Sequence, residues 1–291
     1  PTTEEVFIHG PTNIVVKDRT REQKLDCDLT SEDIHLMCEI LVLKNKVAWN
    51  YQEPFVSFYS EISHKKVRIS LIHYSASPNK QSKLFIRILN DTVIPIDNYN
   101  GPQELYRDLV RQKKNIIIAG PTGSGKTTFT NSMLNLIPKD EHVIIIEDTN
   151  ELIAPTPYTT KLLTDSKNEN KSMNNYLSYA LRMSPERIIL GEIRSKEAES
   201  SLLSMNTGHN GFISTIHANS AKEAIGRLSL LFKIYSNQDL SFELVLKLIT
   251  TNIDYVVFIE DKQVTEIIEV FGSNQENLFY ESVFLREVDS A

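Results

Sequence analysis

Residues Gly120 to Thr128 have the types and spacing needed to bind phosphate. They follow the apolar run Ile116 to Ala119, so a buried strand leads directly into a glycine-rich loop. Glycine lets the backbone adopt conformations that bring its N–H groups close to phosphate oxygens. The segment predicts a nucleoside triphosphate site, with contacts from Gly120, Pro121, Thr122, Gly123, Ser124, Gly125, Lys126, Thr127 and Thr128. A glycine turn that merely joins strand to helix is the alternative.

A helix is expected from Lys126 to Ile137, because apolar residues recur there at helical spacing and Pro138 follows. The positive end of this helix would face the phosphates. Lys126 would then bridge the β- and γ-phosphates, and the Thr127 hydroxyl would be a ligand of Mg²⁺. ATP and Mg²⁺ are therefore the expected cofactors.

Two glutamates follow apolar runs that read as buried strands. Glu192 ends the run that starts at Arg187, and Glu147 directly follows Val143 to Ile146. We expect Glu192 to be catalytic, and Glu147 to bind Mg²⁺ through water or to hold the attacking water. The alternative for Glu192 is an acid that interacts with a helix dipole. Asp148 and Glu151 are interpreted as turn and capping groups.

His217 comes at the end of Phe212 to Ile216, which alternates like a strand. A lone histidine there is often structural, but the strand should lie beside those that carry the loop and the acids. We therefore favour His217 over His209 as a sensor of the γ-phosphate. Eight residues of extended strand would hold the two more than about 20 Å apart, which argues against shared metal ligation.

Arg87 lies on one face of the strand-like segment Leu84 to Leu89 together with apolar residues. A guanidinium is rarely buried without an anion. The anion could be a carboxylate of its own domain or a phosphate presented by the other domain, and both remain open. Arg68 poses the same question with a weaker argument.

Length and composition indicate two domains and exclude several classes of protein. The chain has 291 residues, of which 41% are hydrophobic, and a net charge of -7, so nucleic acid is not expected as the main partner. Its two cysteines, expected to be buried thiols, are too few for a disulfide framework or a four-cysteine zinc site. No apolar run approaches the roughly 20 residues that cross a bilayer, so we expect a soluble chain.

We expect residues 1–97 to form a smaller α+β domain and residues 98–102, rich in Asn, Gly and Pro, to form a linker. Residues 103–291 would then form an α/β domain whose strands run parallel and are covered on both faces. In such a sheet the loop at Gly120 and both acids meet at one carboxyl edge.

Together these motifs resemble those of the secretion-superfamily ATPases that power type II secretion, type IV secretion and type IV pili. The resemblance covers residues 114–231 and rests on four segments in family order: Gly120 to Thr128, Ile146 to Leu152, Leu181 to Arg194, and Gly208 to Leu228. Met205 to Gly211 and Ser214 to Ser220 look most like the tight-adherence (Tad) pilus ATPases. Type IV secretion traffic ATPases come next.

The resemblance implies a RecA-like P-loop ATPase domain, a PAS-like N-terminal domain and a homo-hexameric ring. It implies that Arg68 and Arg87 are directed at the phosphates, and that Arg194 is a further arginine of the active site. The implied function is an Mg-ATP-driven motor for Tad-type pilus assembly, with retraction as an open question. Export of substrates by a type IV secretion system is the alternative.

The implied location is cytoplasmic, peripheral to an inner membrane and in contact with a platform protein there. Other classes stay open: a DNA-dependent motor of similar fold, a scaffold that binds ATP without turnover, and a small-molecule kinase. Because the sequence begins at Pro1 and not at methionine, we also expect that a segment upstream has been removed.

Overall fold

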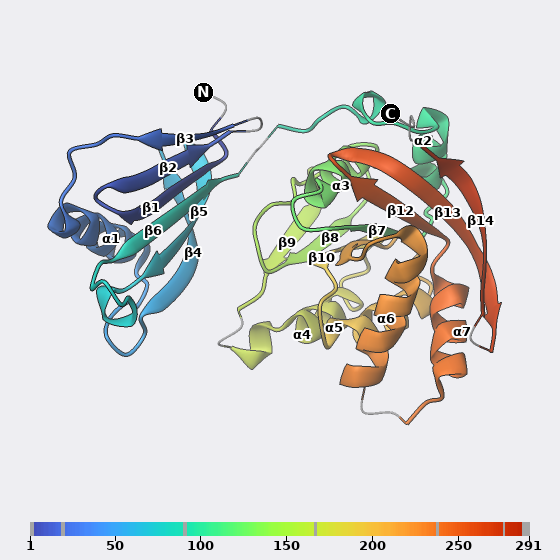
Figure 1. Cartoon of the computed structure of the whole chain (residues 1–291). Helices are drawn as coiled ribbons and strands as arrows, with labels where there is room; N and C mark the ends of the chain where they lie inside the picture. The colour runs from blue at the N-terminus through green and yellow to red at the C-terminus, as the bar shows by residue number, and fades with distance from the viewer. Residues whose placement is uncertain are drawn as a thin grey trace. The chain divides into compact units, whose positions relative to one another are not determined.

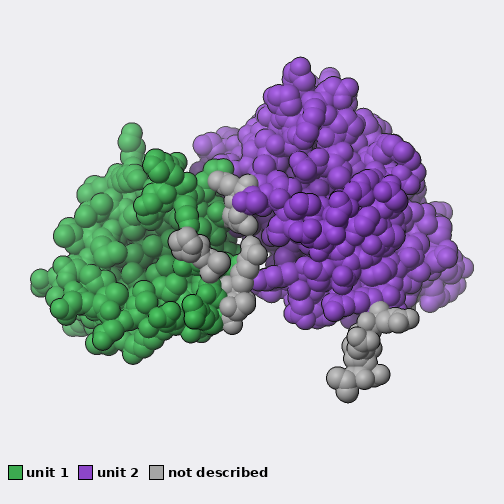
Figure 2. Space-filling model, turned by 90° about the horizontal axis from the view of Figure 1, so that it is seen from above, with its two compact units in different colours: residues 1–91 green, residues 92–291 purple. Residues whose placement is uncertain are grey.

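The computed structural model describes residues 3–18, 21–89, 92–165, 168–236, 239–275 and 277–286. The chain, whose elements are labelled in Figure 1, forms two compact units, residues 1–91 and 92–291, which Figure 2 distinguishes by colour. Each unit has its own sheet and its own hydrophobic core.

The first unit is an antiparallel sheet in the order β3-β2-β1-β6-β5-β4, packed on one helix, α1 (Ser31–Asn45). Thr30 and Asp33 form the capping box that starts α1, and Ile34, Cys38 and Val42 bury one face of it. The strands are β1 (Glu5–Gly10), β2 (Asn13–Lys17), β3 (Glu22–Leu25), β4 (Phe55–Ile62), β5 (Lys65–Ile72) and β6 (Lys83–Ile88).

The second unit is an eight-stranded sheet in the order β14-β13-β12-β7-β11-β10-β8-β9. Its strands are β7 (Ile116–Gly120), β8 (Val143–Glu147), β9 (Thr159–Leu163), β10 (Arg187–Glu192), β11 (Ile213–His217), β12 (Tyr255–Glu260), β13 (Gln263–Asn274) and β14 (Asn277–Leu285). Its α-helices are α2 (Gln103–Arg111), α3 (Lys126–Leu134), α4 (Met173–Ala180), α5 (Glu197–Asn206), α6 (Ala221–Tyr235) and α7 (Phe242–Asn252).

The six strands from β12 to β9 run parallel, while β13 and β14 extend the sheet as antiparallel hairpins. Helices cover both faces of the sheet: α4 to α7 lie on one side, as Figure 1 shows, and α2 and α3 pack on the other. The central strands β7 and β8 are buried at every residue and almost entirely apolar, because helices cover both faces of the sheet there. The predicted α/β class, with a smaller α+β domain at the N-terminal end, is confirmed.

The carboxyl ends of three neighbouring strands carry the predicted chemistry. β11 lies between β7 and β10, so His217 sits between the phosphate loop after Gly120 and the acid Glu192. Glu147 ends β8, one strand farther from the loop. The strand order therefore places His217, and not Glu147, next to both the loop and Glu192.

The segment predicted to be a linker, residues 98–102, is packed onto the second unit. Tyr99 is buried against Phe129, and the backbone of Asn100 bonds with the side chains of Tyr106 and Gln263. The division between the units falls at 91/92, several residues earlier than expected. The Asn, Gly and Pro residues of this segment correctly indicated turns. The segment is not a linker, however, because its contacts are made within the second unit.

Two details of the sequence reading change in the structure. Cys38 is buried as expected, but Cys27 is exposed because it lies in the segment that precedes α1. Helix α3 ends at Leu134, three residues before the predicted end, and Ile137 still packs in the core. Among the described residues, we find no helix with the length and apolar composition needed to cross a membrane.

Candidate active site

The loop after β7 has the conformation of a phosphate cradle. Gly123 and Gly125 have positive φ angles of 76° and 97°, a region that residues with a β-carbon rarely occupy. The space around Gly123 is open, and the buried Ser124 hydroxyl has no hydrogen-bond partner among the described residues. Open space, an unpaired hydroxyl and the start of α3 together fit a bound phosphate group.

The turn between β12 and β13 supports this loop from a distant part of the chain. The backbone N–H of Lys262 donates to the Ser124 carbonyl at 3.0 Å. A β-carbon at Gly120 would lie only 2.2 Å from the Ile259 carbonyl oxygen, so only glycine fits there. Asp261 and Lys262 both hold positive φ angles, a strained turn that the contact with the loop helps to retain. This support could not be predicted from local sequence patterns, because the two segments lie far apart along the chain.

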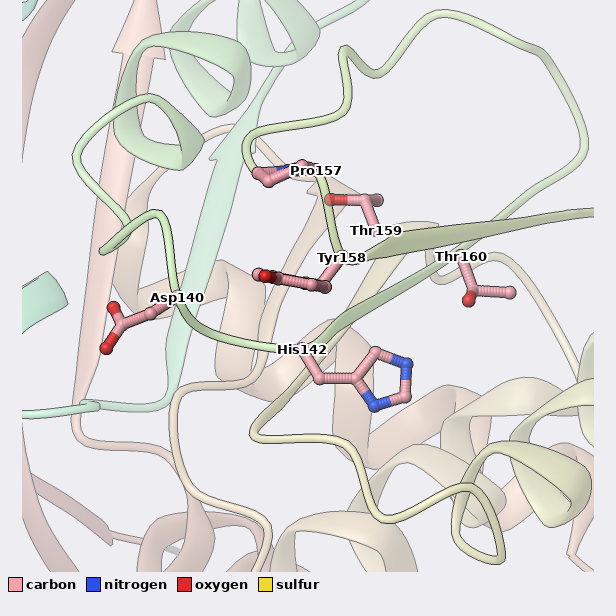
Figure 3. A pocket seen from close by; sticks show the side chains of 6 residues that line it. All are labelled: Asp140, His142, Pro157, Tyr158, Thr159 and Thr160. Carbon is pink, nitrogen blue, oxygen red and sulfur yellow. The ribbon is translucent and has the colours of Figure 1, made fainter.

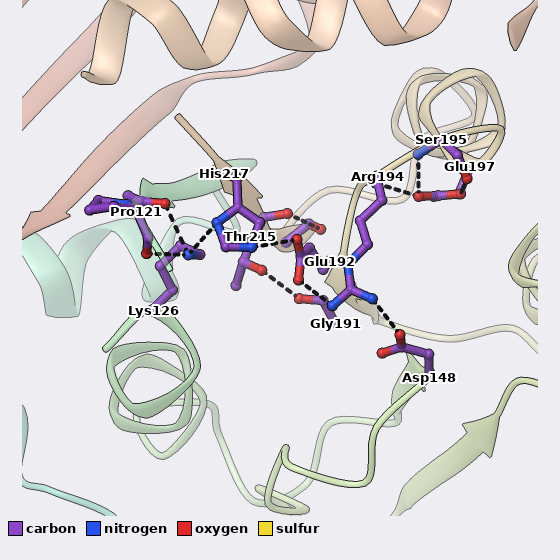
Figure 4. Close-up of polar contacts among 12 residues, drawn as sticks. Pro121, Lys126, Asp148, Gly191, Glu192, Arg194, Ser195, Glu197, Thr215 and His217 are labelled. Atoms are coloured by element: carbon purple, nitrogen blue, oxygen red, sulfur yellow. Dashed lines mark hydrogen bonds and ion pairs between the residues drawn. The ribbon is translucent and has the colours of Figure 1, made fainter. Parts of the chain in front are cut away.

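Lys126, His217 and Glu192 form a chain of contacts beside the loop (Figure 4). The Lys126 ammonium group donates to the carbonyls of Gly120 and Pro121 at 2.9 Å and contacts His217 Nδ1 at 3.2 Å. Lysine can only donate, so Nδ1 accepts and the proton of neutral His217 lies on Nε2. That nitrogen is 3.1 Å from Glu192 Oε1. Burial lowers the pKa of His217, which keeps the ring neutral.

A bulge at Gly191 redirects the side chain of Glu192. Leu190 pairs with Ser214 and Glu192 pairs with Thr215, so Gly191 is an extra residue on β10. The Thr215 hydroxyl donates to the Gly191 carbonyl at 2.8 Å. The bulge turns the end of β10 so that Glu192 meets His217 on one side and Arg194 on the other, as Figure 4 shows.

Arg194 joins two carboxylates at the mouth of the site. Its guanidinium lies 2.7 Å from Glu192 Oε2 and 2.6 Å from Asp148 Oδ2. The hydrogen bond to Glu192 is the main reason that the pKa of Arg194 is raised. Glu197 at the start of α5 accepts from the backbone N–H groups of Arg194 and Ser195 and fixes the segment after β10. Asp148, which the sequence suggested was only a turn residue, is therefore connected to Glu192.

Glu147 is buried and contacts its own surroundings through both carboxylate oxygens. It is 2% exposed, and its Oε2 accepts from the backbone N–H groups of Glu151 and Leu152 at 3.0 and 2.9 Å. Lys161 on β9 lies 2.8 Å from its Oε1. Burial outweighs these contacts and raises the pKa of Glu147. A role for Glu147 in holding Mg²⁺ or water, as predicted, would require some of these contacts to open. Thr127, the other predicted ligand, is half-buried at the second residue of α3.

The two arginines of the first unit lie opposite each other on neighbouring strands, β5 and β6. Arg87 is exposed and lies 3.9 Å from Glu5 on β1, a carboxylate of its own domain. Arg68 is half-buried and pairs in register with Tyr59 on its other side. Both arginines belong to the same face of the sheet, since directly opposite residues point the same way. Their predicted approach to phosphate remains a proposal.

A surface hollow of about 450 Å³ lies at the amino ends of β8 and β9, shown in Figure 3. The phosphate loop, Glu192 and His217 lie at the opposite, carboxyl edge of the sheet. The hollow therefore has no part in the predicted chemistry. It is lined by Asp140, His142, Pro157, Tyr158, Thr159 and Thr160.

A parallel sheet with a phosphate loop after one strand and an acid two strands away defines a P-loop nucleotide-binding protein of the RecA-like class. The assignment to a family is more specific than this class. The model of the type II/IV secretion system protein family matches residues 60–263, and this chain belongs to that family.

Among curated relatives, the chain is similar to the type IV secretion system protein VirB11 of Bartonella quintana and of Bartonella henselae. The identities are 30% and 37% over 262 residues, which cover 85% of this chain and 65% of each relative. The chain thus spans about 65% of the length of these relatives.

Two solved structures share the fold. One is the VirB11 ATPase from the Brucella suis type IV secretion system, with a TM-score of 0.51, 22% identity, and coverage of 97% of this chain and 93% of that one. The other is the pilus retraction motor PilT with bound ADP, with a TM-score of 0.69, 19% identity, and coverage of 98% and 80%.

Proposed function

We propose that this chain is a subunit of a hexameric Mg-ATP-hydrolysing motor that drives export by a type IV secretion system. The observation that carries the proposal is the contact chain from Lys126 through His217 to Glu192 beside the phosphate loop. Membership of the secretion family and the VirB11 relatives support the choice of a type IV secretion system.

Bound Mg-ATP would supply an electrophilic γ-phosphate and a cation that stabilises developing charge. The backbone N–H groups of Gly123 to Lys126 would hold the phosphates, and Thr127 would be a ligand of the cation. Glu192 would accept a proton from water; its side chain is only 12% exposed and has ion-pair partners on both sides, which supports this role. His217 Nε2 lies 3.1 Å from Glu192 Oε1, and Arg194 places positive charge beside the same carboxylate.

The first unit would contribute Arg68 and Arg87 to the phosphates of its own or a neighbouring subunit. Arg87 makes a long, solvent-exposed contact of 3.9 Å to Glu5, and such contacts contribute little to stability. A phosphate could therefore compete for it. By its resemblance to the family, the motor would be cytoplasmic and peripheral to an inner membrane, where it would contact a platform protein.

Assembly of a Tad-type pilus, with or without retraction, is the second candidate. The TM-score to the pilus motor PilT, 0.69, is higher than that to the Brucella suis VirB11 ATPase, 0.51. The segments Met205 to Gly211 and Ser214 to Ser220 resemble the Tad pilus ATPases. The VirB11 relatives support placing the type IV secretion system first, because they are similar in sequence as well as in fold.

Replacement Glu192→Gln tests the hydrolytic role. We expect Mg²⁺-dependent ATP binding to persist and turnover to fall at least a hundredfold, the usual scale for loss of a general base. Glu186→Gln, immediately before the first residue of the same strand, is the matched control and should retain turnover. If Glu192→Gln turned over ATP at the wild-type rate, the assigned chemistry would be wrong.

Complementation separates the two candidates. The two candidates are measured differently: a type IV secretion motor is required for substrate transfer, and a Tad pilus motor is required for surface pili. Restoring substrate transfer in a strain that lacks its VirB11 protein would support the first candidate. Restoring pili alone would favour the second.

A further inference from the structure

The segment that follows β8 is held in place by three side chains from different elements. Glu147 accepts from two backbone N–H groups of this segment, as described above. Asn131 on α3 donates to the Glu151 carbonyl at 3.1 Å and accepts from the Ile153 N–H at 2.8 Å. Lys161 on β9 donates to the Asn150 side chain and to the Leu152 carbonyl. We name residues 148–153 the acid loop.

Lys161 makes contacts that no neutral side chain could reproduce. Its ammonium group donates to Asn150 Oδ1 and the Leu152 carbonyl and lies 2.8 Å from Glu147 Oε1, so one positive charge contacts a carboxylate and two points of the acid loop. The carboxylate it meets is 2% exposed, where a buried charge needs a partner. Lys161 itself is 25% exposed and lies on β9, the edge strand of the sheet.

The acid loop connects Lys161 to the catalytic end of β10. Asp148, the first residue of the loop, lies 2.6 Å from Arg194, and Arg194 lies 2.7 Å from Glu192. Gly191 lies so close to the root of this loop that a β-carbon there would be 2.9 Å from Glu147 Cβ. Movement of the acid loop would therefore shift Asp148 and the arginine that holds Glu192.

We propose that Lys161 is a positioning residue for ATP hydrolysis: it holds the acid loop so that Asp148 aligns Arg194 against Glu192. The inference rests on the proposed function and adds a residue that touches neither nucleotide nor water. A residue on β9, the edge strand of the sheet, would then affect the geometry of the active site.

Lys139 provides a matched control. Its ammonium group donates to the Pro155 carbonyl at 2.8 Å, in the same connection between β8 and β9. No contact from Lys139 to Glu147, Asp148 or residues 148–153 occurs in the described part of the chain. Removing its charge therefore changes the connection without releasing the acid loop.

The test compares steady-state ATPase kinetics of Lys161→Met, Lys161→Arg and Lys139→Met in the full chain. We expect Lys161→Met to lower kcat at least tenfold while KM for ATP changes less than threefold. Lys161→Arg, which keeps a charged donor, should recover at least a third of the wild-type kcat. Lys139→Met should match the wild type. A general loss of fold would also lower the apparent kcat, because less of the protein would be active, but it would lower the melting temperature of Lys161→Met as well, which thermal unfolding of each variant measures.

A second variant addresses the route through Asp148 and covers the case in which Lys161→Met fails to fold. Asp148→Asn and Lys161→Gln should each lower kcat by a similar factor, and the double variant that combines them should be no worse than about tenfold. Independent effects would multiply to about a hundredfold. A multiplicative result, or kcat of the Lys161 variants equal to that of Lys139→Met, would overturn the proposal. Absence of turnover in the wild type would overturn the proposed function as well.

Discussion

Replacement of Arg187 by methionine should strongly destabilise the second unit. Arg187 begins β10, is fully buried, and directs its guanidinium at both oxygens of Glu141 and at the Val110 carbonyl, 2.8 Å from Nη2. Removing one partner of such a pair leaves a buried carboxylate without compensation, which costs about 3–5 kcal/mol. Lys113 remains 3.6 Å from Glu141, so the lower part of that range is expected.

The expected change in melting temperature follows from the size of the unit. About 1 kcal/mol shifts the midpoint of a unit of this size by about 2–4 °C, so the predicted decrease is about 6–12 °C. Thermal unfolding followed by calorimetry measures it. Arg111→Met is the matched control, because Arg111 forms an exposed pair with Asp108 at 2.7 Å and such pairs contribute little.

The pH dependence of this stability difference tests more sharply whether the Glu141 carboxylate is its cause. Burial alone raises the pKa of Glu141, but the hydrogen bonds and charge of Arg187 outweigh burial, and the pKa is lowered. This stabilisation is complete above the ordinary carboxyl value of about 4.3 and is lost as pH falls through the lowered value. Without Arg187, burial dominates and Glu141 binds a proton more readily. The stability difference between Arg187→Met and the wild type should therefore become smaller as the pH falls from 7 to 4. A difference that stays constant over this range would refute this reasoning.

Three further outcomes are expected. Gly120→Ala should weaken ATP binding at least tenfold in titration calorimetry, because its β-carbon would meet the Ile259 carbonyl at 2.2 Å; unchanged binding would contradict the cradle geometry. In native protein at pH 8, iodoacetamide should modify the exposed Cys27 and spare Cys38, whose pKa burial raises to about 12; mass spectrometry should find both modified only after unfolding. The stability that neutral His217 contributes should be complete above about pH 6.5 and decrease as pH falls toward its lowered pKa, and His217→Gln should flatten that decrease.

Much of the second unit could be predicted because its signals are local. An apolar run of four or five residues followed by glycines or an acid identifies a buried strand and what stands at its end, as for Ile116 to Gly120. Parallel strands then bring those ends to one edge. His217 could be placed near the phosphate loop by this argument, and it lies 3.2 Å from Lys126.

Residues whose partners come from other elements could not be predicted in this way. Lys161 was an ordinary polar residue in the sequence, and it became the partner of Glu147 because β9 pairs with β8. Arg187 was interpreted as the start of a strand, without any sign that it is fully buried with Glu141. For Arg87, both a carboxylate and a phosphate were open, and the fold supplies Glu5 through the pairing of β1 with β6.

The sequence by itself determined the phosphate loop, the strand-end acids and the class of fold, because these depend on spacing and polarity within a few residues. Only the tertiary structure decided that Glu192 is held between His217 and Arg194, that Glu147 is engaged by Lys161, and that the turn at Lys262 supports the loop. The physical reason is that ion pairs and hydrogen bonds act over about 3 Å. Which side chains come within that distance depends on strand order and register, which no short segment of sequence encodes.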